Sequence, residues 1–462
     1  MALDTINEEL QLEFEEVLQK NDPLEIRHFL DKQNISDIAD LVYEYPDYES
    51  NILAGMSVHR AAGVFRILDF SIQKRIIQTL APSKTAELLN ELPADDRTSF
   101  LEELPNNAVR ELIKLLDNEE RKITLSLLGY PENSVGRLMT PDYVYVYESN
   151  TVQEVLEIIR RVGKNSETID VIYVINQKGE LLDDIRIREF ILAAPDKKVK
   201  DLMDDRGISL NAYQDQEEAA EIFKMNNRVA LPVVSNNNTL LGIITIDDIL
   251  WVTGEEFSED IQKIGGTEAL EQPYLDISLI KLFKKRVVWL IVLFIGELMT
   301  ISAMHQFEDE IAKVVVLATF IPLIISSGGN SGSQAATLII QAMALREISI
   351  GDWWQIMKRE IFSGLLLGLT LCILGITVIF LWNSWSQVFG EYYLSIALTI
   401  GLSLIGVVLW GTLVGSMLPL LLKRLGADPA ASSTPFVATL VDVTGLIIYF
   451  SVAFLILSGK LL

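Results

Sequence analysis

The sequence predicts a multi-domain membrane protein that joins an α-helical superhelical N-terminal domain, an α+β pair of repeated modules, a charged connecting helix and an all-α domain of five transmembrane helices. Charge is divided unevenly, because residues 281–462 hold 11 Lys/Arg and 10 Asp/Glu whereas residues 1–280 hold 27 and 53. Long apolar segments occur only in the first of these parts, and two internal repeats occur only in the second. A soluble part with a net charge of −26 repels polyanions, so the sequence favours an inorganic cation as partner and excludes nucleic acid.

The N-terminal domain, expected over residues 1–130, contains a repeat of 12 residues. Each unit predicts one short amphipathic helix followed by a break, and such helices must stack because none buries its apolar stripe alone. In the break of ELPADDR, Asp95 and Asp96 are the acids best placed to contact an ion. The units are GVFRILD from residue 63, RIIQTLA from 75, ELLNELP from 87, SFLEELP from 99 and ELIKLLD from 111.

Residues 131–196 and 197–254 follow one template of loop, helix, hairpin and helix. The segments LMT, IDVIYVINQKGELL and IRIREFI of the first copy correspond to LMD, VALPVVSNNNTLLG and ITIDDIL of the second, with QKG and SNNN as the hairpin turns. Asp184 stands in the first copy where the second has Gly242. The pattern resembles a tandem pair of CBS domains, a module that dimerises and often binds nucleotides or ions.

A charged connecting segment, residues 255–280, follows the pair and predicts a helix that ends at Gly265–Gly266. Glu256, Glu259 and Asp260 are spaced i, i+3 and i+4, so they share one helical face. Like charges on one face repel each other unless cations gather on them. The pattern alone leaves two interpretations open, a solvated acidic stripe and a metal-sensing face.

The membrane domain, residues 281–462, contains five segments of the length that a bilayer requires. Pro322 and a glycine cluster are expected to break the second of them. Basic residues flank alternate connections, which predicts a multi-pass protein of the cell membrane with its N-terminal domains in the cytoplasm. The predicted spans are residues 287–304, 312–343, 361–382, 394–422 and 436–457.

Two acids, Asp442 and Glu297, lie inside these spans. A carboxylate at membrane depth is costly unless it is paired or hydrated, so both are candidates for an ion path, the alternative being a carboxylate satisfied by a hydroxyl or a lysine. The second span contains PLIISSGGNSGSQAAT, in which Asn330 and Gln334 share a helical face. Its density of polar residues and glycines favours a pore-lining role over small-residue helix packing.

These features together resemble the MgtE family of magnesium channels, from about residue 25 to 460, with GGNSGSQ and LVDVTG as the specific motifs. The resemblance implies a homodimer in which the second and fifth spans line a pore between the subunits. It implies that Asp442 binds a hydrated Mg²⁺. The other predicted pore residues are Ala438, Gly328, Gly329, Asn330, Gln334 and Glu297.

The resemblance also implies a cytosolic Mg²⁺ sensor, in which EEFSED forms the acidic face of a plug helix and Asp428 lies at the cytosolic mouth. Arg188 falls where family members contact ATP, the candidate nucleotide of the CBS pair. Trp251 and Asn227 stand where relatives carry acids, which reduces the number of expected sensor sites. The predicted sensor acids are Asp95, Asp96, Asp215, Glu217, Asp248, Glu256, Glu259, Asp260 and Asp428.

The predicted function is that of a Mg²⁺-selective channel for magnesium uptake that closes when cytosolic Mg²⁺ is high. The alternative is a secondary transporter coupled to protons or ions, carrying Mg²⁺, Co²⁺ or Mn²⁺, although the spans show no inverted repeat. An enzyme is not expected, because His305 and Cys372 are isolated in the sequence. Oxygen ligands alone favour hard ions over softer ones.

Overall fold

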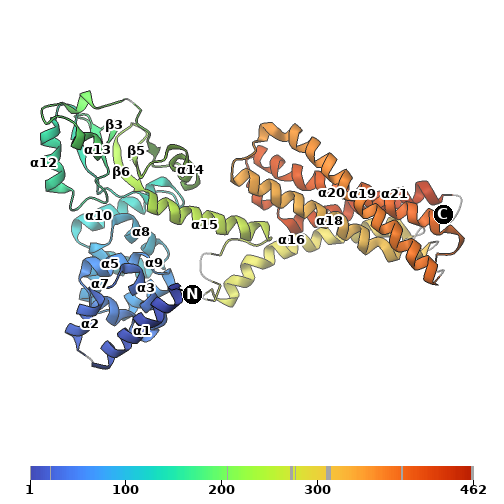
Figure 1. The fold of residues 1–462 in the computed structure, drawn as a ribbon, viewed down its shortest axis with the longest axis horizontal. Coiled ribbons are helices and arrows are strands. Elements are labelled where there is room, and N and C mark those ends of the chain that lie inside the picture. The colour runs from blue at the N-terminus through green and yellow to red at the C-terminus, as the bar shows by residue number, and fades with distance from the viewer. Residues whose placement is uncertain are drawn as a thin grey trace. The chain divides into compact units, whose positions relative to one another are not determined.

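The computed structural model describes residues 2–20, 22–204, 206–270, 274, 275, 277–308, 314–386 and 389–458. The chain divides into two compact units, Met1–Glu255 and Glu256–Leu462, and each is considered by itself. The first unit combines stacked short helices with two small sheets, and the described part of the second unit is helical (Figure 1). These elements confirm the predicted fold class.

Short helices fill the N-terminal domain, and α5 to α9 begin at residues that are 12 apart, as the five repeat units predict, with α10 following at the same spacing. Their apolar stripes share one core, in which Leu30, Val64 and Leu89 are completely buried. Stacking therefore provides the burial that no single helix achieves. The helices are α1 (Ala2–Lys20), α2 (Pro23–Leu30), α3 (Ile35–Glu44), η1 (Pro46–Tyr48), α4 (Glu49–Ala54), α5 (Val58–Arg66), α6 (Phe70–Thr79), α7 (Pro82–Glu91), α8 (Ala94–Glu102), α9 (Asn106–Ile113) and α10 (Asn118–Leu127).

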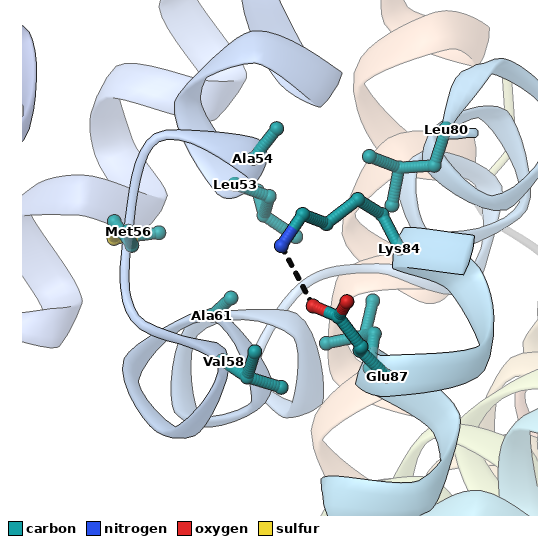
Figure 2. A pocket seen from close by; sticks show the side chains of 9 residues that line it. Leu53, Ala54, Met56, Val58, Ala61, Leu80, Lys84 and Glu87 are labelled. Carbon is teal, nitrogen blue, oxygen red and sulfur yellow. Dashed lines mark hydrogen bonds and ion pairs between the residues drawn. The ribbon is translucent and has the colours of Figure 1, made fainter. Parts of the chain in front are cut away.

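A small cavity of about 20 Å³ lies among these helices, between apolar side chains such as Leu53 and Val58 (Figure 2). Lys84 and Glu87 form an ion pair of 2.6 Å at its edge. This volume holds one water molecule at most, so the cavity is a packing gap and not a ligand site.

The two repeated modules have the same topology, with the order β1-β2-β3 in one sheet and β4-β5-β6 in the other. In each sheet the first pair of strands is parallel and the second antiparallel. Asp183 pairs with Val174 and Gly242 with Val233, so the structural equivalent of Gly242 is Asp183, and the predicted equivalence with Asp184 is wrong by one residue. The elements are α11 (Val135–Leu138), β1 (Tyr145–Tyr147), α12 (Val152–Val162), β2 (Val171–Ile175), β3 (Leu181–Arg186), α13 (Ile187–Leu192), η2 (Val199–Asp201), β4 (Leu210–Asn211), α14 (Gln216–Asn226), β5 (Ala230–Val234), β6 (Leu240–Thr245) and α15 (Ile246–Ile264).

The difference between the two copies has a structural reason. A Cβ at Gly242 would lie 2.7 Å from the carbonyl oxygen of Thr140, so that position cannot hold a side chain. Asp183, at the equivalent position, accepts from the backbone amides of Asp184 and Asp204 at 2.9 Å. The neighbouring Asp184 accepts a hydrogen bond of 2.6 Å from Arg228 of the second copy and therefore links the two copies. Helix α15 then continues without a break from the second copy to Ile264, just before Gly265.

The second unit contains five helices, among the described residues, that are long and apolar enough to cross a membrane, as predicted. Helix α20 packs against α18, α19 and α21, while α16 packs along α21. The elements are α16 (Leu279–Gln306), α18 (Val315–Ala344), η3 (Ile350–Asp352), α19 (Trp353–Ser386), η4 (Gly390–Tyr392), α20 (Tyr393–Arg424), η5 (Pro429–Ala431) and α21 (Thr434–Leu457).

The expected break in the second span is wrong, because α18 runs as one helix through Pro322 and the glycine cluster. A proline removes a single helical hydrogen bond, whereas a break at membrane depth would expose several backbone groups where no water satisfies them. The glycines serve packing against α20. A Cβ at Gly415 would collide with the carbonyl of Gly332, and a Cβ at Gly411 with that of Gly328.

Candidate functional site

The two intramembrane acids lie together. Asp442 of α21 and Glu297 of α16 are within hydrogen-bonding reach of each other. Two carboxylates this close repel each other unless a proton or a cation lies between them. The neighbour of Asp442 is therefore another acid. The alternative interpretation, a carboxylate satisfied by a neighbouring group, required a hydroxyl or a lysine instead.

Helix α18 approaches this acid pair through Gly329. A Cβ at Gly329 would lie 3.5 Å from the Cβ of Ala438 and 3.6 Å from Oδ1 of Asp442. Of the predicted pore residues, Gly329, Ala438, Asp442 and Glu297 are thus brought together. Gly328 instead lies in the contact with α20, next to Val407 and the backbone of Gly411.

The two amides predicted for the pore lie on the surface of the single chain. Asn330 and Gln334 are both exposed, and the Nδ2 of Asn330 donates to the Oγ of Ser326 at 3.4 Å. Their helix, α18, is one of the five candidate spans. Polar groups on the outer face of a membrane span need a polar partner, because lipid offers them none.

A second group of acids surrounds Lys263, near the end of α15. The Nζ of Lys263 lies 2.5 Å from Oε1 of Glu259 and 2.7 Å from Oδ2 of Asp428. Burial and the negative charge of Asp428 raise the pKa of Asp260 beside them. We call Lys263, Glu259, Asp260 and Asp428 the Lys263 cluster. The acidic face of the connecting helix therefore meets the predicted mouth acid, with a lysine between them.

Two polar contacts of the backbone hold the Lys263 cluster in place. The Oγ1 of Thr434, at the start of α21, donates to the carbonyl of Ile264 at 3.2 Å. The carboxylate of Asp428 accepts from the backbone amide of Ala430 at 2.8 Å. Glu256 lies one turn before Glu259 and is half-buried. The connecting helix is thus tied directly to the entrance of the last span.

A third group of acids surrounds Arg66, at the end of α5. Arg66 pairs with Asp96 at 2.9 Å, with Asp247 at 3.1 Å and with Glu167 at 3.6 Å. Asp95 and Asp248 also belong to this group, because their charges act on each other and on Asp96. We call Arg66, Asp95, Asp96, Glu167, Asp247 and Asp248 the Arg66 cluster. It brings together the sensor acids that the sequence predicted in the helical domain and in the second CBS copy.

Buried polar contacts position these acids. The fully buried Arg97, next to Asp96 on α8, donates to the carbonyls of Leu89 and Leu92 at 3.1 Å. Asp248 accepts a hydrogen bond of 2.7 Å from the Oγ1 of Thr245 at the end of β6. Both contacts fix the first turn of the helix that carries the acid.

The Arg66 cluster holds more negative charge than one guanidinium neutralises. Asp95 is 5% exposed and its Oδ1 has no hydrogen-bond partner. Burial and the charge of Asp248 raise the pKa of Asp95 well above its usual range. Burial raises the pKa of Asp96 to about 7, against the opposing effect of Arg66, and raises that of Asp248 to about 6. Within the described part of the chain, no three acidic, histidine or cysteine side chains are arranged as a ready metal site.

The remaining predicted residues have local roles. Asp215 caps α14 by accepting from the amide of Glu217 at 2.8 Å. Asn227 ends the same helix with a φ of 49°, a conformation that asparagine tolerates better than most residues. The side chain of Arg188 is 76% exposed and lies 3.9 Å from Glu189. These residues do not join either cluster.

Sequence reasoning missed Arg66, Glu167, Asp247 and Lys263. Each is an ordinary charged residue within its own helix or loop, and at least one of its partners lies far away in the sequence, as with Arg66 and Asp247 or Lys263 and Asp428. The usable signal was indirect, since a group of buried acids in a folded protein needs a cationic partner.

Models of known families match three parts of the chain. The intracellular N domain of MgtE matches residues 33–133, and the CBS domain matches residues 135–196 and 199–253. The MgtE family, described as a divalent cation transporter, matches residues 321–452.

Two relatives match almost from end to end. The magnesium transporter MgtE of Thermus thermophilus is 36% identical over 98% of this chain and 100% of the relative. That of Bacillus subtilis is 30% identical over 93% of each chain. Both relatives are named as transporters and not as enzymes, in agreement with the prediction.

Two solved structures resemble the N-terminal part. The cytosolic domain of the Mg²⁺ channel MgtE in complex with ATP has 33% identity and a TM-score of 0.50, covering 52% of this chain and 98% of that one. The soluble part of a magnesium transporter has 25% identity and a TM-score of 0.51, covering 54% and 99%.

Proposed function

This chain belongs to the MgtE family, and from that premise we propose that it is a Mg²⁺ channel that mediates magnesium uptake and closes when cytosolic Mg²⁺ rises. It is a multi-pass membrane protein with cytoplasmic N-terminal domains. The observation that carries the proposal is the intramembrane acid Asp442, with Glu297 on one side and the backbone of Gly329 on the other.

Mg²⁺ keeps its water shell tightly, so a path that selects it hydrated needs acceptor oxygens and not a dry cage. Asp442 supplies such oxygens, and Glu297 adds a second negative charge at the same depth. A divalent ion gains about twice the Coulomb energy of a monovalent one at this site. We therefore assign Asp442 as the residue that binds the hydrated ion.

A second copy of the chain is the partner in this proposal. Asn330, Gln334 and Glu297 are exposed on the spans of the single chain, although they belong at membrane depth. A twofold partner would cover these polar groups and place the ion path between the subunits, while lipid covers the apolar faces. The domain ranges given from the sequence are kept in this proposal, with residues 255–280 as the plug segment.

Gating follows from the two acidic clusters on the cytoplasmic side. Each holds more acids than cationic side chains, so divalent ions that bridge the acids favour the compact arrangement. The closed state would bind Mg²⁺ more tightly than the open state, which gives negative feedback on uptake. Asp215 and Glu217 remain candidate sensor acids at the start of α14.

ATP binding is a separate part of the proposal, supported by the similarity to a cytosolic domain solved with ATP. Arg188, exposed on α13, is the residue that we assign to the phosphates. Titration of the Arg188→Ala variant with ATP tests this assignment, since equal affinity in variant and wild type would contradict it.

One observation favours a second candidate function, a secondary transporter coupled to protons. Two neighbouring carboxyl groups at membrane depth, such as Asp442 and Glu297, are the kind of pair that proton relays in transporters use. In that mechanism Mg²⁺, Co²⁺ or Mn²⁺ would enter as protons leave.

Reconstitution into liposomes separates the two candidates. An indicator inside the vesicles reports Mg²⁺ entry, with and without an imposed pH gradient, for wild type and Asp442→Asn. A channel gives entry that needs only the Mg²⁺ gradient and is lost in the variant. Entry that occurs only with a pH gradient would instead support the coupled transporter. Steps of Mg²⁺ on the cytoplasmic side of a planar bilayer then test closure.

A further inference from the structure

Arg66 connects three separate parts of the first unit. Its guanidinium reaches Asp96 of the helical domain, Glu167 in the loop before β2 of the first CBS copy, and Asp247 at the start of α15 in the second copy. The three N–O distances are 2.9, 3.6 and 3.1 Å. A planar guanidinium with five donors suits such simultaneous contacts better than an ammonium group.

The acids around Arg66 do not tolerate its removal easily. Asp95, Asp96 and Asp248 are buried away from water, and their negative charges repel one another. Asp95 also has a buried carboxylate oxygen without a hydrogen-bond partner. Without a positive charge, the surfaces of the helical domain and the CBS pair would therefore repel each other at this place.

We propose that Arg66 is a built-in counter-ion that favours docking of the helical domain onto the CBS pair before divalent ions bind, so that less Mg²⁺ completes it. This inference rests on the proposed function, because it concerns the same sensor. Arg66 neutralises part of the acid cluster at all times, and divalent ions have only the remainder to neutralise. The side chain thus sets how strongly docking depends on cytosolic Mg²⁺.

The test measures docking directly, in the full-length chain in lipid nanodiscs. Spin labels are attached to cysteines introduced at two exposed positions, Glu111 on α9 and Arg161 on α12, in a Cys372→Ala background. Labelled chains are diluted with unlabelled ones, so that pulsed dipolar spectroscopy reports distances within one chain. Spectra are recorded in EDTA and at increasing Mg²⁺ for the parent, Arg66→Gln and Arg66→Lys.

We expect the distance distribution of the parent to broaden moderately in EDTA and to narrow as Mg²⁺ is added. The distribution of Arg66→Gln should broaden further in EDTA and need more Mg²⁺ to narrow, and that of Arg66→Lys should lie between the two. A charge-assisted hydrogen bond contributes enough that the Mg²⁺ midpoint for docking should rise on the order of 10-fold in Arg66→Gln. The matched control is Arg75→Gln, which removes the ion pair with Glu49 inside the helical domain and should behave as the parent.

Three results would overturn the inference. The parent could broaden in EDTA as much as Arg66→Gln, the variant could remain narrow in EDTA, or Mg²⁺ could fail to narrow the variant while Arg66→Lys behaves in the same way. The last pattern would mark Arg66 as a structural residue only. Because docking is measured instead of transport, a failure of the proposed channel function would leave this result interpretable.

Discussion

At the scale of single residues, the candidate ion path depends on Gly329 having no side chain, which leaves the space beside Asp442 open. The glycines of one helix serve two different surfaces, since Gly329 faces Asp442 whereas Gly332 touches the backbone of Gly415. Substitutions at the two surfaces should therefore have different effects, one on transport and the other on stability.

We predict that Gly329→Leu abolishes Mg²⁺ entry into liposomes, because its side chain must lie against the carboxylate of Asp442. Gly329→Ala should remain active, since its Cβ would stand 3.6 Å from Asp442, an ordinary contact distance. Gly415→Ala should instead lower the free energy of unfolding by about 1–3 kcal/mol, because the added methyl group overpacks the contact. A lower unfolding temperature in detergent would report this loss. Equal transport by Gly329→Leu and wild type would contradict the assigned path.

The acids of the Arg66 cluster predict a pH dependence. The pKa of Asp96 is raised to about 7 and that of Asp248 to about 6, both above the value of about 4 for an unfolded chain. The folded state therefore binds more protons than the unfolded chain does. The stability that these two groups contribute is fully present below about pH 4 and is lost as the pH rises through 6 and 7. In EDTA, we expect the soluble unit within the full chain to unfold at a higher temperature at pH 6 than at pH 8.

The variant Asp96→Asn provides the check on this pH effect. It carries no charge at this position, so its unfolding temperature should depend less on pH between 6 and 8. An undiminished dependence would show that other groups are responsible. The measurement is differential scanning fluorimetry on protein of known metal content.

At the scale of the elements, α15 is tied to the entrance of α21 through Lys263. The lysine lies between Glu259 and Asp428, both partly exposed. Lys263 neutralises part of the acidic charge at this contact, as we propose that Arg66 does between the helical domain and the CBS pair. A side chain of the protein provides the positive charge in each cluster.

We predict that Lys263→Met raises the Mg²⁺ concentration that half-closes the channel, because Glu259, Asp260 and Asp428 then repel each other until divalent ions bind. Exposed ion pairs contribute up to about 1 kcal/mol, which corresponds to a shift of roughly 5-fold. Recording the current in planar bilayers while the cytoplasmic Mg²⁺ concentration is raised in steps measures this half-closing concentration. Lys84→Met removes a comparable pair with Glu87 in the helical domain and should leave the curve unchanged.

The elements themselves could mostly be predicted from local patterns. The 12-residue repeat indicated the positions of α5 to α9, and the length of the apolar segments indicated the five spans. The break predicted at Pro322 was wrong, because the low helix propensity of proline is outweighed by the cost of unpaired backbone groups where the membrane holds no water. The distant partners of Arg66 and Lys263 could not be predicted, since nothing local fixes which distant acid a cationic side chain meets. Only Glu259, four residues before Lys263, is a local partner.

At the scale of the whole molecule, the polar residues on the outer face of α18 argue for assembly. Asn330 and Gln334 cannot remain against lipid without partners. The family resemblance predicted a homodimer, and these exposed amides are a physical reason to expect one.

We predict that the purified chain has the mass of a dimer by light scattering in detergent. A cysteine introduced at Asn330 in the Cys372→Ala background should form a crosslink between two chains under oxidation. Asn51→Cys, exposed in the helical domain, serves as the control and should stay uncrosslinked. A monomer mass at all concentrations would contradict the assembly and with it the intersubunit path.

The contact between α18 and α20 has one more consequence. Around Gly332 and Gly415 the two helices meet through backbone atoms, so no side-chain rotamer is available to widen or tighten the contact. Two rods joined in this way move as one piece. In the proposed ion path, any change in width beside Gly329 must then come from displacement of α21 and its neighbour α16, the helices that carry the two acids. The wall of this proposed path that α18 forms would stay stationary, and the charged wall would be the one that moves.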